Sequence, residues 1–416
     1  MLNLVTANQE ENQALTSLLD DIARNGARKM LLEALEQEVA EYTARHKHER
    51  DDEGRALVVR NGKGKPRKVT VGAGTLGVRA PRINDRREGK QFTSKILPPY
   101  LRKSANVETL LPILYLKGLS TSDFKSALTC ILGDGASGLS ASSITSLKKS
   151  WEKEFDEWKI NAITDRFVYL WADGVNVKVR LGEDKKLCLL VIMGVNEKGE
   201  KKLLAVEPGY RESKDSWSFV LRDLMKRGLT PPLLAVGDGA LGFWAAIGDV
   251  MPKVTQQRCW FHKMGNVLNE LPKRLQPKAT EMMREMIRAN SSTDAGAALQ
   301  DFKSAFGAKH EKAVNLLEKD WTELTAYFKF PAMHWKSIRT TNPIESTFAT
   351  VKLRTKVTKG AGSPKAASTM AFKLMLEAEK KWRRIRGYQE IELLLSGVEY
   401  KDGVVVTKDS HREAVA

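Results

Sequence analysis

Three apolar runs decide the fold, namely FVYLWADGVNVKV at residues 167–179, LCLLVIMGV at 187–195 and KLLAV at 202–206. They are rich in β-branched and aromatic residues, which favour strands. Because no helical pattern separates them, we expect an antiparallel meander of three or four adjacent strands. Within the first run, Asp173-Gly174 is expected to end one strand before another begins at Val175.

Strands and helices alternate downstream of this meander. The sequence predicts a helix over residues 216–227, an apolar strand over 233–236, a helix over 241–250 and a short strand over 254–259. A meander followed by strand, helix and strand is the layout of a mixed sheet with helices on its faces, so the predicted fold class is α/β. Residues 261–328 then show only helical periodicity, which indicates an all-helical insertion.

The N-terminal part combines helical and strand patterns. Leucines spaced by three and four residues predict amphipathic helices over 10–46, with a break at Asn25-Gly26. Residues 46–68 are basic and broken by glycines, so we expect a mobile arm that binds phosphates. Val69–Val71 and Leu76–Val78 flank a glycine-rich turn and predict a β-hairpin.

A second helical pattern covers residues 106–158. The hydroxyl-rich helix start at 140–147, followed by Lys148 and Lys149, resembles the second helix of a helix-turn-helix. A plain helical bundle is the equally weighted alternative.

The balance of charge points to a polyanionic partner. Of 416 residues, 68 are Lys or Arg and 51 are Asp or Glu, which leaves a net charge of +17. Basic surfaces gain affinity for nucleic acid because each neutralised phosphate releases counterions. The longest apolar run is far shorter than the roughly 20 residues that cross a bilayer, and the N-terminus lacks the pattern of a secretory signal. Three scattered cysteines suit a reducing compartment. We therefore expect a cytoplasmic DNA-binding protein with no membrane partner.

Two acids directly follow apolar strands. Asp238 lies in LLAVGDGA at residues 233–240, and Asp173 ends the first strand in the same way, each before a glycine. If these strands are neighbours, both carboxylates lie at one sheet edge, where they suit a hard divalent cation. Taken alone, each Asp-Gly pair is more often a turn. The G-x-G-x-x-G spacing around Asp238 does not indicate a dinucleotide site, because this carboxylate would repel a pyrophosphate.

A third acid stands in basic surroundings. Glu345 belongs to TTNPIESTF at residues 340–348, where Asn-Pro starts a helix and the acid lies in its first turn. It is the only carboxylate between Arg339 and Lys365, a stretch with six Lys and Arg residues. Together with the two aspartates it completes the ligand set of a two-metal site for phosphodiester chemistry.

These residues carry a family resemblance. The chain resembles bacterial mutator-type insertion-sequence transposases, which are DDE recombinases with an RNase H-like core. The resemblance covers nearly the whole length. Its motifs are RNG at 60–62, YRESKDSW at 210–217, LAVGDGALGFW at 234–244, QRCWFHK at 257–263 with Asn266, and TNPIES at 341–346.

The resemblance implies that Asp173, Asp238 and Glu345 are the catalytic triad and the metal ligands. It implies two Mg²⁺ ions, for which Mn²⁺ substitutes, and a helical insertion domain between the second and third acids. Water attack would free a 3′-hydroxyl that then attacks target DNA. The partners would be double-stranded terminal inverted repeats and target DNA, bound by a homodimer or larger assembly on the bacterial nucleoid. Two alternatives stay open: a domesticated DNA-binding protein without catalysis, and an RNase H-like nuclease that cuts without joining.

Cys259 and His262 follow the second acid at a spacing that suits zinc. They make only half a zinc site, because Cys130, Cys188 and His334 provide no matching pair. The resemblance implies that both support the active site and the DNA near it. A packed cysteine beside a satisfied histidine is the alternative.

The predicted organisation has six segments. They are an N-terminal helical and β-hairpin region for DNA binding and dimerisation (1–105), a helical region (106–165), the first part of the catalytic core (166–262), a helical insertion (263–335), the last part of the core with basic helices (336–398) and a tail (399–416). Basic residues in these segments are expected to contact DNA. They are Arg55, Arg60, Lys63, Lys65, Arg67, Lys68, Arg258, Lys263, Arg339, Lys352, Arg354 and Lys356.

Overall fold

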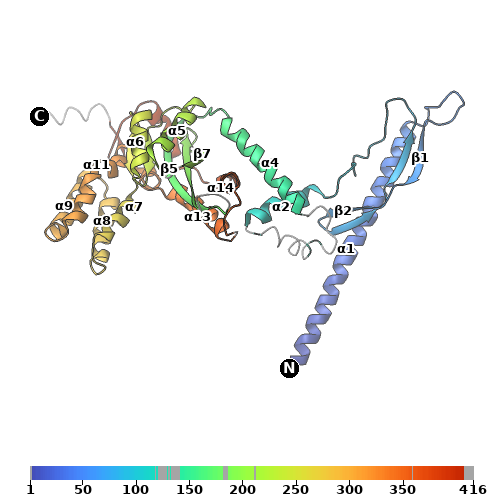
Figure 1. The fold of residues 1–416 in the computed structure, drawn as a ribbon, viewed down its shortest axis with the longest axis horizontal. Coiled ribbons are helices and arrows are strands. Elements are labelled where there is room, and N and C mark those ends of the chain that lie inside the picture. Colours follow the sequence, from blue (N-terminus) through green and yellow to red (C-terminus); the bar gives the residue numbers. More distant parts are fainter. Residues whose placement is uncertain are drawn as a thin grey trace. The chain divides into compact units, whose positions relative to one another are not determined.

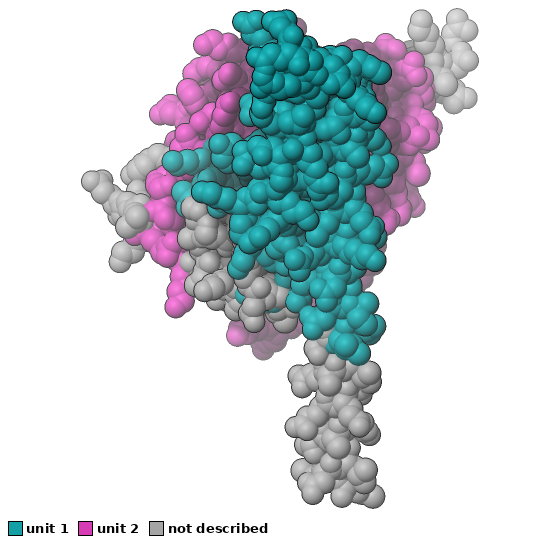
Figure 2. Space-filling model, turned by 90° about the vertical axis from the view of Figure 1, so that its right-hand side faces the viewer, with its two compact units in different colours: residues 1–149 teal, residues 150–416 magenta. Residues whose placement is uncertain are grey.

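The computed structural model divides the chain into two compact units, residues 1–149 and 150–416, which Figures 1 and 2 display. It describes residues 2–406 except 118, 120–128, 130–131, 133–140, 181–185, 210–211 and 358. The finer division into six segments stays a prediction.

The first unit begins with one long helix, α1 (Leu2–Arg45). The expected break at Asn25-Gly26 is therefore wrong. A glycine in a helix costs only about 1 kcal/mol relative to alanine, and a side chain at Gly26 would meet no atom within 4 Å. The position is open, so the glycine weakens the helix without disturbing any packing.

Four short strands follow α1. β1 (Val58–Lys63) pairs antiparallel with β4 (Pro81–Asp85), and β2 (Arg67–Val71) pairs antiparallel with β3 (Gly74–Val78). The β2–β3 hairpin confirms the sequence-based expectation. The expectation of a mobile arm over 46–68 is wrong for its second half. Apolar residues there anchor β1 and the start of β2, and both strands belong to the layer that packs against α1. Residues of α1, the hairpin and the following loop form the core of this unit, namely Leu35, Val69, Leu76, Val78 and Leu97.

Two further helices are described between β4 and the sheet of the second unit, α2 (Ala105–Lys117) and α4 (Ala141–Ile160). The expected helix-turn-helix falls mostly outside the described residues. The boundary between the two units lies within α4.

The second unit is built on a five-stranded mixed sheet, and this confirms the predicted α/β class (Figure 1). The order across the sheet is β7-β6-β5-β8-β9. β5, β6 and β7 form the expected antiparallel meander, while β8 and β9 run parallel to β5. The strands are β5 (Phe167–Lys178), β6 (Lys186–Asn196), β7 (Lys201–Gly209), β8 (Leu234–Gly237) and β9 (Thr255–Arg258).

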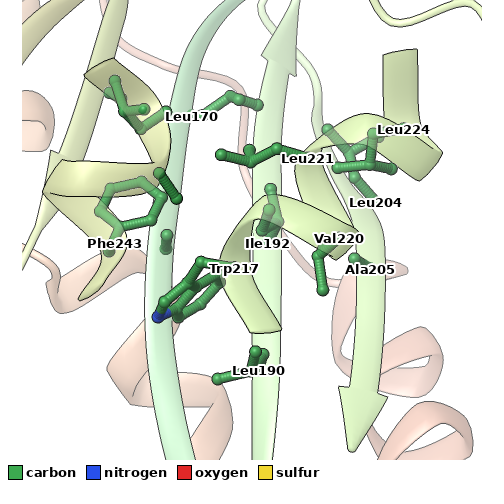
Figure 3. Close-up of a cluster of buried hydrophobic side chains, with 14 of the residues drawn as sticks. Leu170, Leu190, Ile192, Leu204, Ala205, Trp217, Val220, Leu221, Leu224 and Phe243 are labelled. Atoms are coloured by element: carbon green, nitrogen blue, oxygen red, sulfur yellow. The ribbon is translucent and has the colours of Figure 1, made fainter. Parts of the chain in front are cut away.

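One face of this sheet is covered by α5 (Lys214–Lys226) and α6 (Leu241–Val250), which also pack on each other. Figure 3 shows the α5 side chains lying over the strands in this layer. The fully buried Trp217 and Leu221 project from α5 toward Ile192 of β6. Burial of these large apolar groups fixes α5 on the sheet, and with it the start of the helix at its N-cap Ser213.

The other face is covered by α13 (Asn342–Val357), which contacts β5, and α14 (Pro364–Glu379), which contacts β7. Trp171 of β5 ties the segment before α13 to the sheet, because its indole N–H donates to the carbonyls of Ser337 (3.3 Å) and Thr340 (3.1 Å). A buried hydrogen bond of 2.7 Å joins Tyr169 Oη and His334 Nδ1.

Helices fill the chain between β9 and α13, as the sequence predicts. None of the helices in the described part of the chain is long and apolar enough to span a bilayer. The helices after β9 are α7 (Trp260–Asn269), α8 (Gln276–Arg288), α9 (Ser292–Phe306), α10 (Glu311–Lys319), α11 (Trp321–Leu324), η1 (Ala326–Lys329), η2 (Ala332–His334) and α12 (Trp335–Ile338). The C-terminal elements are η3 (Tyr388–Glu390), α15 (Ile391–Leu395) and the paired strands β10 (Tyr400–Lys401) and β11 (Val404–Val405).

Candidate functional site

The two aspartates meet where a short strand ends beside a long one. β8 runs parallel to β5, and their last paired residues are Gly237 and Ala172. Asp238 and Asp173 are the next residues of the two strands, so they leave this point side by side. The adjacency predicted from the sequence is therefore present.

One detail of that prediction is wrong. Asp173 does not end a strand at a turn: β5 continues to Lys178, and Asp173 stays paired opposite Val191 of β6. The neighbouring β6 is long enough to hold β5 extended beyond the end of β8. The Asp173 side chain is 9% exposed, and its Oδ1 accepts a hydrogen bond of 2.7 Å from the Gly174 amide.

A third carboxylate joins the aspartates. Asp173, Glu212 and Asp238 each offer an oxygen within 4.8 Å of the other two. Glu212 lies immediately before Ser213, the N-cap of α5, whose Oγ accepts a hydrogen bond from the Ser216 amide. In the sequence, Glu212 is recognisable only as part of the motif at 210–217, which gives it no individual role. We call Asp173, Glu212 and Asp238 the carboxylate cluster.

Glu345 belongs to a second group. It lies in the first turn of α13, where Glu345, Cys259 and His262 offer ligand atoms within 4.8 Å of one another. Thr341, which is fully buried, connects the members of this group. Its hydroxyl donates to Glu345 Oε1, and its amide donates to Cys259 Sγ at 3.3 Å. The predicted triad is thus divided between two groups, and Thr341 is a second residue that sequence reasoning missed.

The two groups share one electrostatic environment. Burial, with the negative charges of Asp238 and Glu345, raises the pKa of Asp173 to about 7. Burial and the charge of Asp238 also raise the pKa of Glu212. Crowded, partly desolvated carboxylates repel one another, and a bound cation would relieve that repulsion.

Cys259 and His262 form a charge-stabilised pair. A hydrogen bond with Cys259, reinforced by the charges of Cys259, Glu345 and Asp238, raises the pKa of His262 to about 9. Burial opposes ionisation of Cys259, but hydrogen bonds from His262 and Thr341 outweigh it and lower the pKa of the thiol. The imidazolium adds one positive charge beside Glu345, with His262 Nδ1 at 3.7 Å from Glu345 Oε1.

The donor atoms of the two groups suit different cations. Three carboxylate oxygens are hard ligands of the kind that Mg²⁺ prefers, and opposite oxygens of a magnesium shell are about 4.2 Å apart. Neighbouring oxygens of that shell are only about 3.0 Å apart, so the three side chains, whose oxygens lie within 4.8 Å of one another, would draw together around one ion. The thiol and imidazole of the second group are softer donors, and the Glu345 carboxylate is a third potential ligand beside them.

Several residues expected to contact DNA are engaged elsewhere. Lys263 is 2% exposed, with its ammonium 2.6 Å from Asp320, and Arg258 lies 3.1 Å from the same carboxylate. Arg354 is 3% exposed, and the Arg339 guanidinium donates to the Ile287 carbonyl at 2.7 Å. The expectation of a phosphate contact is therefore wrong for Lys263 and Arg354, because burial withdraws their charges from the surface.

Other predicted basic residues are accessible. Lys352 and Lys356 of α13 line a groove of about 490 Å³ that β5 borders on its other side. We call this the lysine groove; its lining residues are Asn176, Lys178, Lys352, Thr355, Lys356 and Lys359. In the first unit, Arg60 and Lys63 lie 2.6 and 3.8 Å from Glu36, and both side chains remain more than half exposed. Arg67 donates to the carbonyls of Pro98 and Leu101, whereas Arg55, Lys65 and Lys68 are exposed.

Comparison with known proteins gives one consistent result. A family model described as "Transposase, Mutator family" matches residues 2–385. The transposase for insertion sequence element IS6120 of Mycolicibacterium smegmatis is 50% identical over 297 residues, which is 71% of this chain and 91% of that protein. The transposase for IST2 of Acidithiobacillus ferrooxidans is 46% identical over 67% of this chain and 94% of its own length. The transposase for IS256 in transposon Tn4001 of Staphylococcus aureus is 23% identical over 91% of this chain and 95% of its own.

Proposed function

Because the chain belongs to the Mutator family of insertion-sequence transposases, we propose that it cuts and joins DNA by DDE chemistry in an RNase H-like core. Asp173, Asp238 and Glu345 are the proposed catalytic triad. The substrates are the terminal inverted repeats of its element and the target DNA.

The observation that carries this proposal is the junction of β5 and β8. Asp173 lies within β5, and Asp238 directly follows the end of β8. Because the two strands are parallel neighbours, both acids lie side by side at the same position along the sheet. Because the sheet fixes the backbone at both residues, the two carboxylates are held close together before a metal binds. A metal site for phosphoryl transfer needs ligands that are preorganised in this way.

Glu345 is included for electrostatic and positional reasons. Its charge acts on Asp173, and the charges of both Glu345 and Asp238 act on His262. Trp171, two residues before Asp173 on β5, holds the carbonyl of Thr340. Thr341, the next residue, donates to the Glu345 carboxylate. A short chain of contacts therefore links the third acid to the strand that carries the first.

Divalent magnesium, when bound, supplies the positive charge that stabilises the developing charge on the scissile phosphate. The chain's own residues have separate tasks. The three acids would hold the ions, and Thr341 orients Glu345 through its hydroxyl. The His262 imidazolium, held by Cys259, lies beside the third acid, in a supporting role without zinc of its own.

We propose two surfaces for DNA. The lysine groove continues along α13 from the helix start that carries Glu345, so phosphates bound by Lys352 and Lys356 would lie on the same helix as the third acid. In the first unit, the exposed residues Arg55, Lys65 and Lys68, with Arg60 and Lys63, would bind the terminal repeats. Pairing of two element ends in one complex implies that the working form on DNA is a dimer or a larger assembly.

The test replaces each acid by its amide. Asp173→Asn, Asp238→Asn and Glu345→Gln preserve shape and remove a ligand charge. Loss of partners that only support a metal ligand already costs about 10- to 100-fold, so Mg²⁺-dependent nicking and strand transfer on a labelled element end should fall more than about a hundredfold. DNA binding should persist, since the lysines remain. Asp301→Asn, an exposed acid on α9, is the matched control and should be fully active. Cleavage near the wild-type rate by any amide variant would remove that residue from the triad.

A further inference from the structure

The position of Glu212 is fixed by the fold. It lies two residues before α5, whose Trp217 is 1% exposed and whose Leu221 is fully buried against the sheet. Ser213 caps the helix through the Ser216 amide at 3.3 Å. A residue held between a capped helix and the strand before it has little freedom to move away from its neighbours. Glu212 is therefore placed beside the two aspartates by the packing of α5.

Two glycines make room for Glu212. A Cβ atom at Gly174, the residue after Asp173, would collide with the Glu212 carboxylate. A Cβ atom at Gly242, in the first turn of α6, would collide with the Glu212 carbonyl and would lie 2.8 Å from the Lys214 amide nitrogen. Neither glycine has the positive φ angle that itself favours glycine. Close approach of Glu212 is thus the physical reason for a glycine at both positions.

The carboxylate cluster has no lysine or arginine partner among the described residues; His262 of the neighbouring group lowers the pKa of Asp173 and Glu212, but burial and the other carboxylates outweigh it. In the described part of the chain, no lysine or arginine nitrogen lies within 4.0 Å of Asp173, Glu212 or Asp238, although Lys and Arg outnumber the acids in the whole chain by 68 to 51. Other partly buried acids do have such partners, for example Glu207 with Lys159 at 2.7 Å. Three like charges gathered without a lysine or arginine point to a cation supplied from outside the chain.

We propose that Glu212 is a fourth metal-ligating carboxylate of the active site, and that it binds one divalent cation together with Asp173 and Asp238. This inference rests on the proposed function, since it assigns a further ligand to the same metal site. Glu345, in the group with Cys259 and His262, then completes the site from the α13 side. The catalytic set of this chain has four acids instead of three.

The primary test measures metal binding without DNA and without catalysis. Full-length protein is titrated with Mn²⁺ and the bound fraction is followed by electron paramagnetic resonance. Glu212→Gln should weaken Mn²⁺ binding at least tenfold, as should Asp173→Asn and Asp238→Asn. Asp215→Asn is the matched control, because Asp215 is an exposed acid three residues further along and outside the cluster, and it should bind Mn²⁺ as the wild type does.

A second variant tests position instead of charge. Gly174→Ala keeps all the acids but places a methyl group against the Glu212 carboxylate. It should also weaken Mn²⁺ binding severalfold and raise the Mg²⁺ concentration that gives half-maximal nicking. Thermal melting without metal shows whether each variant is folded. Since Glu212→Gln removes repulsion, its melting temperature without metal should equal or exceed that of the wild type, while the stabilisation by added Mn²⁺ should shrink.

The outcomes separate this inference from the proposed function. If the two aspartate variants lose Mn²⁺ binding and a folded Glu212→Gln protein does not, the fourth ligand is refuted and the triad stands. If the wild-type protein binds no Mn²⁺ at millimolar concentrations, the metal site itself is refuted. If Gly174→Ala and Glu212→Gln are both impaired and Asp215→Asn is not, Glu212 is a ligand.

Discussion

The buried ion pair between Lys263 and Asp320 provides a quantitative test of the structure. Lys263 is 2% exposed, and its ammonium lies 2.6 Å from Asp320 and 2.6 Å from the Leu316 carbonyl. Removing one partner of a buried pair leaves an uncompensated charge and costs about 3–5 kcal/mol. Asp320→Asn does this while preserving side-chain volume, and it also strips the partner from Arg258.

The expected consequence is a large loss of stability that a second change repairs. For a unit the size of residues 150–416, 1 kcal/mol corresponds to roughly 2–4 °C in melting temperature. Asp320→Asn should therefore lower the melting temperature by about 6–20 °C. Adding Lys263→Met removes the orphaned charge, so the double variant should recover about 1–3 kcal/mol relative to Asp320→Asn alone.

The effect should depend on pH with a definite sign. Burial lowers the pKa of Lys263, so in the Asp320→Asn variant the folded state binds its proton more weakly than the unfolded state. The penalty is complete while Lys263 is protonated in both states. It shrinks as pH rises through the folded-state pKa toward the unfolded value near 10.4.

The assay is thermal and urea unfolding of full-length protein, with the single and double variants compared at pH 7 and pH 9.5. Lys263→Met alone should also leave the affinity for DNA and its salt dependence unchanged, because the buried ammonium meets no phosphate. The reasoning is refuted if the double variant is less stable than Asp320→Asn, or if Lys263→Met reduces the salt dependence of DNA binding.

Three further predictions concern the site and the DNA surface. Changing both Lys352 and Lys356 to alanine should reduce the slope of log K against log salt by about 2, since each neutralised phosphate contributes roughly 0.9; an unchanged slope would exclude the lysine groove. Thr341→Val keeps the shape of the side chain and removes the hydroxyl that orients Glu345, so nicking should fall about 10- to 100-fold with folding intact, and full activity would contradict the positioning role. Protein purified without chelator should contain no stoichiometric zinc, and one zinc per chain that disappears in Cys259→Ser would show a metal role for this thiol instead of a supporting one.

Much of the second unit could be predicted because its elements have strong local signals. The apolar segment at 233–236 is too short for a helix and lies between turn residues, and β8 (Leu234–Gly237) occupies it with a shift of one residue. The helix over 241–250 has the predicted bounds. The division of β5 at Asp173-Gly174 was predicted wrongly, because an Asp-Gly pair favours a turn only when no neighbouring strand holds it extended.

The first unit was predicted less well, because contacts with neighbouring elements outweigh the local preferences of its sequence. Local propensity at Asn25-Gly26 opposes a helix. One unfavourable glycine does not interrupt α1, because other residues of α1 contact β3 of the hairpin and the paired strands β1 and β4. Basic residues near 60 suggested an unstructured arm, because their charges dominate the composition. In the structure, Val58 of β1 and Val69 of β2 are buried and anchor the strands, while Arg60, Lys63 and Lys68 are exposed.

The sequence pattern identifies some residues of the site and misses others. Asp173 and Asp238 were recognisable because each follows an apolar strand, and Glu345 was recognisable because it interrupts a basic stretch. Glu212 neither follows an apolar strand nor interrupts a basic stretch. It lies next to Ser213, the N-cap of α5, so its position in the sequence is explained by the start of a helix. Only the packing of α5 brings it to the aspartates. The missing signal was at Gly174 and Gly242, two glycines outside any left-handed turn. A glycine without such an angle can lie in open space, as Gly26 does, but Gly174 and Gly242 both lie against the same glutamate.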